Sequence, residues 1–169
     1  MAEGSPKGTA GIAESKIGAP MRRLEDQRFL TGQGRYADDM ALADMAHAYV
    51  LRSPHGHARI RSIDKSDALA DPGVLTILTG EDVAKEKLGA LRCGSFPRLP
   101  PGVPSFCPTQ PILAADKVRH VGDRVALVVA TSLAAAKDAA ERISVQYEAL
   151  PAVTLVDALA PGAAKVWDE

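Results

Sequence analysis

Histidine and cysteine are the residues of this chain that could do the most varied chemistry. His55 and His57 flank Gly56, and two cysteines stand elsewhere in the sequence. A structural metal site needs paired ligands at short spacing on both sides, and neither Cys93 nor Cys107 has a Cys or His two to four residues away. We therefore interpret His55 as a turn histidine and His57 as a strand-start histidine with local hydrogen bonds. A small metal enzyme is the alternative; its further ligands would come from His47, His120, Cys93 and Cys107.

Both cysteines lie in a proline-rich segment, residues 89–111. Proline lacks a backbone donor and restricts the residue before it, so we expect a long loop without regular elements. Loops of this length are usually functional or disordered. A reactive cysteine needs an electropositive, partly exposed setting; Arg92 adjoins Cys93, but the sequence shows no Cys–His pair. We interpret the segment as a structural or docking loop rather than a nucleophile or redox centre.

Residues 32–37, Gly-Gln-Gly-Arg-Tyr-Ala, match a Gly-x-Gly-x-x-Gly/Ala pattern. In a dinucleotide site this turn follows a strand and opens a helix, whose N-terminus meets the pyrophosphate. Here Asp38 and Asp39 follow at once, and their charges would repel a phosphate. The pattern therefore predicts a structural turn.

A dense stretch of mixed charge precedes that turn, made by Arg22, Arg23, Glu25, Asp26 and Arg28. Such a stretch is by default a solvated face. The alternative is a surface that forms charge-assisted hydrogen bonds to a partner chain.

The composition excludes several classes of protein. Of the 169 residues, 46% are hydrophobic and 24% charged, and 20 Lys and Arg against 21 Asp and Glu give a net charge of −1. A dedicated nucleic-acid binder would carry a basic excess, and a membrane span would need about 20 consecutive apolar residues. Two cysteines build no disulfide framework. The start of the chain lacks the apolar core of a secretory signal, and no apolar stretch follows Arg22-Arg23 as twin-arginine export would require. We expect a cytoplasmic protein with a flexible tail, residues 1–17, and one domain, residues 18–169.

Hydrophobic periodicity predicts an α/β domain with a mixed sheet. A strand, a helix and a strand follow one another from Arg124 to Tyr147, which is typical of a βαβ unit with a parallel strand pair. Residues 74–78 and 125–129 are apolar at successive positions, as in central buried strands. The other expected features are strands at 46–52, 58–64 and 117–121, helices at 65–70 and from 131 or 132 to 142, and a capping box from Thr79 to Asp82.

Taken together, several segments resemble the molybdenum-binding large subunit of the xanthine dehydrogenase, aldehyde oxidase and carbon monoxide dehydrogenase family. They occur in the family's order and together reach from about Ile17 to Glu169. The matching segments are residues 18–26, 29–39, 52–60, 71–74, 78–82, 118–130 and 145–151.

The resemblance implies the α/β hammerhead domain that opens that subunit. It also implies an oxidoreductase that hydroxylates carbon centres with water as the oxygen source, or oxidises carbon monoxide. The implied assembly uses molybdopterin, in its cytosine dinucleotide form, together with two [2Fe-2S] clusters and FAD. The implied partners are the remainder of the molybdenum-binding subunit, an iron–sulfur subunit and an FAD subunit.

Within such a subunit the opening domain is a packing module. We therefore expect no catalytic, cofactor-binding or metal-binding residue in this chain. The expected partner interface is Arg22, Arg23, Asp26 and Arg28.

The sequence departs from the family at its end, because it stops at Glu169 and has no Gly-Gly-x-Gly pterin segment. We expect the chain alone to be inactive and to bind no molybdenum, iron or flavin. It is interpreted as a split subunit, a truncated piece or a free-standing homologue. The alternative function is a stand-alone hammerhead binding module with no molybdenum assembly.

Overall fold

A computed structural model describes residues 23–91, 100–102 and 106–167. Residue contacts divide the chain into two units, Met1–Leu42 and Ala43–Glu169. The expected tail, together with Arg22 and Cys93, lies outside the described residues. The two units are described separately below.

The first unit contains α1 (Asp26–Leu30) and the short 3-10 helix η1 (Ala37–Asp39), neither with a buried residue. Phe29 stacks on Tyr36 with ring centroids 5.6 Å apart. A Cβ placed on Gly34 would lie 2.6 Å from the Phe29 ring, so a larger residue here would displace that ring. A helix precedes the Gly-x-Gly pattern and a 3-10 turn follows it, which confirms the structural turn.

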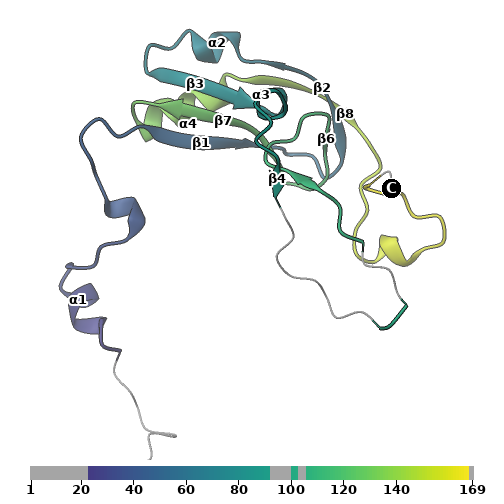
Figure 1. Ribbon diagram of the computed structural model, residues 1–169, viewed down its shortest axis with the longest axis horizontal. Helices are drawn as coiled ribbons and strands as arrows, with labels where there is room; N and C mark the ends of the chain where they lie inside the picture. The colour runs from purple at the N-terminus through teal and green to yellow at the C-terminus, as the bar shows by residue number, and fades with distance from the viewer. Residues whose placement is uncertain (1–22, 92–99, 103–105, 168–169) are drawn as a thin grey trace, which may run out of the picture. The chain divides into compact units, whose positions relative to one another are not determined.

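The second unit is built on two small sheets. Sheet A contains β1 (His47–Arg52), β7 (Arg124–Ala130) and β3 (Val74–Thr79), in the order β1-β7-β3, with antiparallel pairing throughout. Figure 1 shows these three strands side by side, with a helix behind them.

Sheet B contains β6 (Lys117–Val118), β2 (Ala58–Asp64) and β8 (Ser144–Ala149), again antiparallel. A further two-stranded ladder joins β4 (Ala90–Leu91) to β5 (Gln110–Pro111). The expectation that residues 89–111 hold no regular element is therefore wrong at both ends of the segment. Each of these strands is only two residues long, and Pro111 itself pairs with Ala90 in the ladder.

The helix α4 (Leu133–Glu141) joins β7 to β8, as the periodicity predicts. However, β7 lies in sheet A and β8 in sheet B, and all the described ladders are antiparallel. The predicted parallel pair is wrong. A strand–helix–strand pattern shows the order of elements along the chain, whereas the pairing depends on which sheet offers the returning strand an edge.

The main core lies between α4 and sheet A. The Ser132 hydroxyl caps α4 by accepting a hydrogen bond from the Ala135 N–H at 3.1 Å, as expected. Small side chains on the inner face of α4 let the helix lie close to the strands. The buried cluster is Ala68, Ile77, Ala126, Val128, Ala130, Ala136, Ala139, Ala140 and Ile143.

The two strands expected at the centre of a sheet have different positions. β7 lies between two neighbours and is central, whereas β3 pairs only with β7 and is an edge strand. Leu75 on β3 is 57% exposed, and Ile77 and Thr79 are the buried residues of this strand. The expectation of a second central strand at residues 74–78 is therefore wrong.

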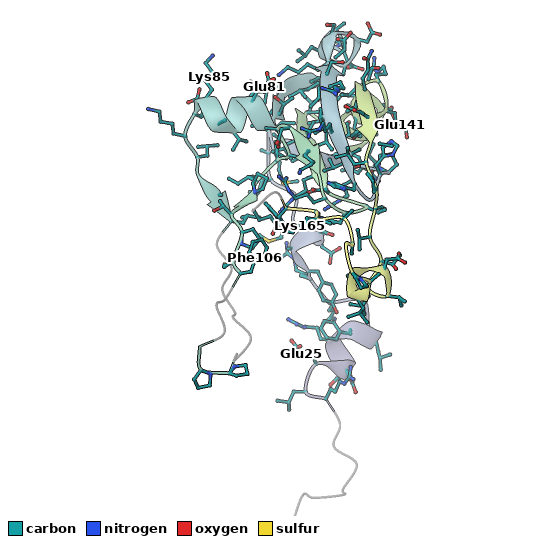
Figure 2. All side chains as sticks on the ribbon, turned by 90° about the vertical axis from the view of Figure 1, so that its right-hand side faces the viewer. Glu25, Glu81, Lys85, Phe106, Glu141 and Lys165 are labelled. Carbon is teal, nitrogen blue, oxygen red and sulfur yellow. The ribbon has the colours of Figure 1, made fainter. Side chains whose placement is uncertain are left out.

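Two short helices flank β3: α2 (Ser66–Leu69) and α3 (Gly80–Lys85). Figure 2 labels Glu81 and Lys85 on α3. The capping box at the start of α3 is confirmed, since the Thr79 N–H and hydroxyl donate to Asp82 Oδ2 at 2.8 and 2.9 Å. A Cβ on Gly80 would lie 2.6 Å from the backbone of Ala115, so only glycine fits at this approach. No helix in the described part of the chain is long and apolar enough to cross a membrane.

Candidate functional site: an uncovered sheet face and a polar junction

The side chains of β7 alternate between the two faces of sheet A. Ala126, Val128 and Ala130 pack with α4, so Leu127 and Val129 point to the other face. The strand register completes this second face, which we call the front face. Its members are Ala48, Val50, Thr76, Leu78, Leu127 and Val129.

The front face belongs to neither buried core cluster, and each of its six residues is half-buried or exposed. Figure 1 views sheet A from this side, with α4 on the far side of the strands. A half-covered apolar sheet face of this kind is typical of a surface that another protein segment covers.

Further apolar side chains are exposed outside the sheets. Leu24 and Leu30 of the first unit are 101% and 86% exposed. In the second unit, Leu155 and Leu159 lie beside and within the 3-10 helix η2 (Asp157–Leu159) and are 88% and 85% exposed. These four leucines bury little or none of their surface within the chain.

The expected charged interface lies partly outside the described residues, because Arg22 does. Arg23 and Arg28 are exposed, and Asp26 is half-buried. Arg28 forms an ion pair with Glu25, and its guanidinium lies 5.2 Å from the centroid of the Phe29 ring. Arg23 and Asp26 line one pocket beside α1, and Arg28 pairs with Glu25 on the same turn. The role of these residues in an interface stays a prediction.

A buried polar junction links the turn after β1 to the turn before β7. The Ser53 N–H donates to the Asp123 carbonyl and the Gly122 N–H donates to the Ser53 carbonyl, both at 2.8 Å. Arg52 Nη1 donates to the Gly122 carbonyl at 2.9 Å. Asp123 is 7% exposed, and its carboxylate accepts hydrogen bonds from the backbone N–H groups of Arg119 and Arg124, each at 3.0 Å. The backbone groups of this junction thus pair with one another and with the Asp123 carboxylate.

Tyr147 extends this junction from β8. Its ring lies 4.7 Å from the ring of His55, centroid to centroid. Burial raises the pKa of Tyr147; the hydrogen bond with Ser53 opposes this shift, and the negative charge of Asp123 adds to it. The phenol therefore stays neutral at physiological pH and can hydrogen bond within the junction.

His57 is buried and joins two distant segments. Its Nδ1 lies 2.8 Å from the Pro151 carbonyl, so Nδ1 carries the proton and donates. The Leu150 N–H donates back to the His57 carbonyl at 2.9 Å, and His57 Nε2 has no partner among the described residues. The expectation of local hydrogen bonds is therefore wrong for His57, whose ring bonds to a residue 94 positions away.

The metal interpretation finds no ligand set in the described part of the chain. No group of three or more His, Cys, Asp or Glu side chains there could hold a metal ion. His55 contacts Tyr147 and His57 contacts Pro151, so the two histidines serve different contacts. These residues do not fit a molybdenum centre, and no step of a reaction is assigned to them.

Arg119 and Trp167 form the part of the site that sequence reasoning missed. The guanidinium lies 4.1 Å from the centroid of the indole ring, and Nη1 donates to the Lys117 carbonyl at 3.0 Å. Asp123, at the other end of the same turn, was also missed. A carboxylate placed directly after a glycine, where the chain enters a buried strand, is the signal that could have found it.

Comparison with known proteins assigns the fold and the family. The family profile described as "Aldehyde oxidase and xanthine dehydrogenase, a/b hammerhead domain" matches residues 31–151. The chain belongs to this family. The expected α/β hammerhead fold is confirmed, with antiparallel ladders where a mixed sheet was expected.

Several relatives are large subunits of oxidoreductases. The carbon monoxide dehydrogenase large chain of Afipia carboxidovorans is 42% identical over 141 residues, which cover 83% of this chain and 16% of that protein. The nicotine 6-hydroxylase large subunit of Paenarthrobacter nicotinovorans is 38% identical over 142 residues, covering 84% of this chain and 17% of that one.

Among solved structures, quinoline 2-oxidoreductase from Pseudomonas putida 86 superposes with a TM-score of 0.75 and 46% identity. This match covers 88% of the hammerhead chain and 18% of the solved chain. The copper- and molybdenum-containing CO dehydrogenase has a TM-score of 0.70 and 38% identity. The hammerhead chain therefore spans 16–18% of the length of these relatives, and it is homologous to one part of the large subunit of molybdenum hydroxylases.

Proposed function

We propose that this chain is the hammerhead part of a molybdenum-dependent hydroxylase and that it supports the active site from outside, without a catalytic residue of its own. The observation that carries this proposal is the front face of sheet A, an apolar surface that the described chain leaves half-covered. The same domain in the relatives is one part of a much longer chain, which offers material to cover such a face.

The front face is the contact with the remainder of the molybdenum-binding subunit. Leu127 lies on the central strand β7, and Val50 is its cross-strand neighbour on β1; both are apolar, and a docked segment would bury them. The charged stretch, including Arg23, Asp26 and Arg28, is the contact with the iron–sulfur subunit. Arginine suits such a contact, because its planar fork holds a carboxylate in two parallel hydrogen bonds.

The cofactors of the assembly belong to its other parts. Molybdopterin, in the cytosine dinucleotide form, two [2Fe-2S] clusters and FAD would be held outside the hammerhead domain, in the cytoplasm. This proposal is supported by the length of the relatives, of which the chain spans only 16–18%. The substrate is determined by residues of the remainder of the subunit.

A stand-alone binding module is the second candidate. It is supported by the closed apolar cluster between α4 and sheet A, which gives the second unit a core of its own. The two candidates differ in what the chain binds in its host.

The test is purification of the tagged chain from its host under mild conditions. The hydroxylase proposal predicts copurifying subunits, molybdenum by elemental analysis and the absorption bands of [2Fe-2S] clusters. Leu127→Asp should remove all three, because a charge on the front face cannot be buried there unpaired. Leu133→Asp is the matched control, since Leu133 is 45% exposed at the start of α4 and lies off the front face.

The outcomes separate the candidates. A wild-type chain that copurifies with none of these components would favour the stand-alone module. After separation from its partners, the chain alone should hold no molybdenum, iron or flavin above trace. A stoichiometric metal in the separated chain would instead favour the enzyme built on His55 and His57.

A further inference from the structure

A cavity of about 250 Å³ lies beside the polar junction, within the second unit. Arg119, His120 and Asp123 line it from the turn before β7, Gln110 lines it from β5, and Trp167 lines it near the end of the described chain. Typical pockets for drug-sized ligands occupy about 300–1,000 Å³. This cavity is thus sized for one small polar group.

Arg119 is held in place at the cavity wall. Its ring contact with Trp167 and its hydrogen bond to the Lys117 carbonyl fix the plane of the guanidinium. Its backbone N–H donates to the Asp123 carboxylate, which fixes the start of the side chain. An arginine side chain ordered in this way loses little further entropy when it binds a ligand.

Within the described part of the chain, the same guanidinium has no acidic partner. None of the ion pairs among the described residues includes Arg119, and its Nε is buried with no hydrogen-bond acceptor. A buried donor without an acceptor costs free energy. An oxygen ligand that reached this edge of the guanidinium would remove that cost.

We propose that this cavity is a carboxylate-binding site, with Arg119 as the residue that recognises the anion. The two oxygens of a carboxylate match the fork of a guanidinium. The Asp123 carboxylate lines the same cavity and opposes a second negative charge, so a monoanion fits better than a phosphate dianion. The Gln110 amide offers a further donor at the wall. This inference goes beyond the proposed packing function and does not depend on it.

The carboxylate could be a small free acid or an acidic side chain of another protein segment. Both present the same group to Arg119. Acetate serves as the probe for a free acid, and N-acetyl-glutamate amide serves as the probe for a side chain.

Trp167 supplies the readout, because it is the only tryptophan of the chain and lies against the binding group. Tryptophan fluorescence of the full 169-residue chain is titrated with sodium acetate, at constant ionic strength set with sodium chloride. We expect a saturable change for the wild type and at least a tenfold weaker apparent affinity for Arg119→Gln. Arg119→Lys keeps the charge without the fork and should lie between the two; it also tests the site if Arg119→Gln fails to fold.

Arg61→Gln is the matched control. Arg61 is exposed on β2 and pairs with Glu148 on β8, so this variant should titrate like the wild type. Tighter binding of N-acetyl-glutamate amide than of acetate would identify a protein side chain as the natural source, and equal or weaker binding would identify a free acid. An unchanged affinity in both Arg119 variants, no saturable response to acetate, or tighter binding of phosphate than of acetate would overturn the proposal.

Discussion

The two units of this chain close short helical turns with the same device. The Tyr36 N–H donates to Asp39 Oδ2 at 2.8 Å in the first unit, and the Thr79 N–H donates to Asp82 Oδ2 at 2.8 Å in the second. Their surroundings differ. Thr79 is buried and Asp82 also pairs with Lys65, whereas Tyr36 and Asp39 are both exposed.

The difference shows what a local hydrogen bond contributes with and without burial. In the described part of the first unit, an exposed ion pair, one aromatic stack and one capping contact hold two short helical segments. Exposed contacts of this kind contribute about 0–1 kcal/mol each. In the second unit, hydrogen bonds and ion pairs of the same kind lie next to an apolar core, and that core supplies most of the stability. We therefore expect substitutions in the second unit to change the stability of the chain and those in the first unit to change its contacts with partners.

The largest effect is expected for Val128→Asp. Val128 is 0% exposed between β7 and α4, so the variant would bury an unpaired carboxylate. We expect the free energy of unfolding to fall by about 4 kcal/mol, measured by urea denaturation. Leu133→Asp, at an exposed position of α4, is the control and should stay close to the wild type. A melting temperature of Val128→Asp within a degree or two of the parent would contradict the core assignment.

A smaller effect is expected for Asp82→Asn. The hydrogen bond from Lys65, followed by that from the Thr79 N–H, lowers the pKa of Asp82 to about 2. A lowered pKa means that the carboxylate stabilises the fold above its ordinary pKa of 3.8 and that this contribution is lost as the pH falls toward 2. Because about a third of the side chain is exposed, solvent screening limits the contribution to about 1 kcal/mol.

Urea unfolding of both proteins at several pH values tests this prediction. The difference in the free energy of unfolding between the wild type and Asp82→Asn should be largest at pH 6 and should shrink between pH 4 and pH 2. Asp39→Asn makes the equivalent change in the first unit and should leave the urea midpoint in place. Equal losses of stability in Asp82→Asn and Asp39→Asn would show that the two units do not differ in this respect.

Tyr147→Phe tests the polar junction. Burial raises the pKa of Tyr147 above 10.0, so the neutral phenol contributes stability that is full below pH 10 and is lost as the pH rises further. Near pH 7 the variant should lose about 1 kcal/mol, since the hydrogen bond with Ser53 is removed. Above pH 10 the difference in the free energy of unfolding between the wild type and Tyr147→Phe should decrease. Urea unfolding at pH 9 to 11 measures this. A gap that widens in that range would mean that the phenolate is the form that stabilises the fold.

The smallest effect on the chain itself is expected for the double variant Arg22→Ala with Arg23→Ala. Arg23 is exposed, and exposed charges contribute about 0–1 kcal/mol, so the melting temperature of the isolated chain should hardly change. Assembly with the other subunits should weaken by about 2–5 kcal/mol, because a desolvated pair would be broken on one side. Coelution at limiting concentration measures this loss. Equal coelution of wild type and variant would indicate that the charged stretch is a solvated surface and not a partner contact.

The sequence by itself determined the elements whose signals are local. The apolar run at Arg124–Ala130, the Ser132 cap and the Thr79–Asp82 capping box all appear in the structure at the expected residues. Each depends on side chains within about four positions of one another or on simple periodicity, so neighbouring residues suffice to specify it. The resemblance to the hammerhead family also came from the sequence, through short motifs in a fixed order.

Only the tertiary structure decided which strands share a sheet and which side chains meet across the chain. The edge position of β3, the separation of β7 from β8 and the bond from His57 to Pro151 all join residues far apart in the sequence. The same holds for Arg119 against Trp167. These contacts form because the whole chain minimises its exposed apolar surface and pairs its buried polar groups at once, a balance that no local pattern records.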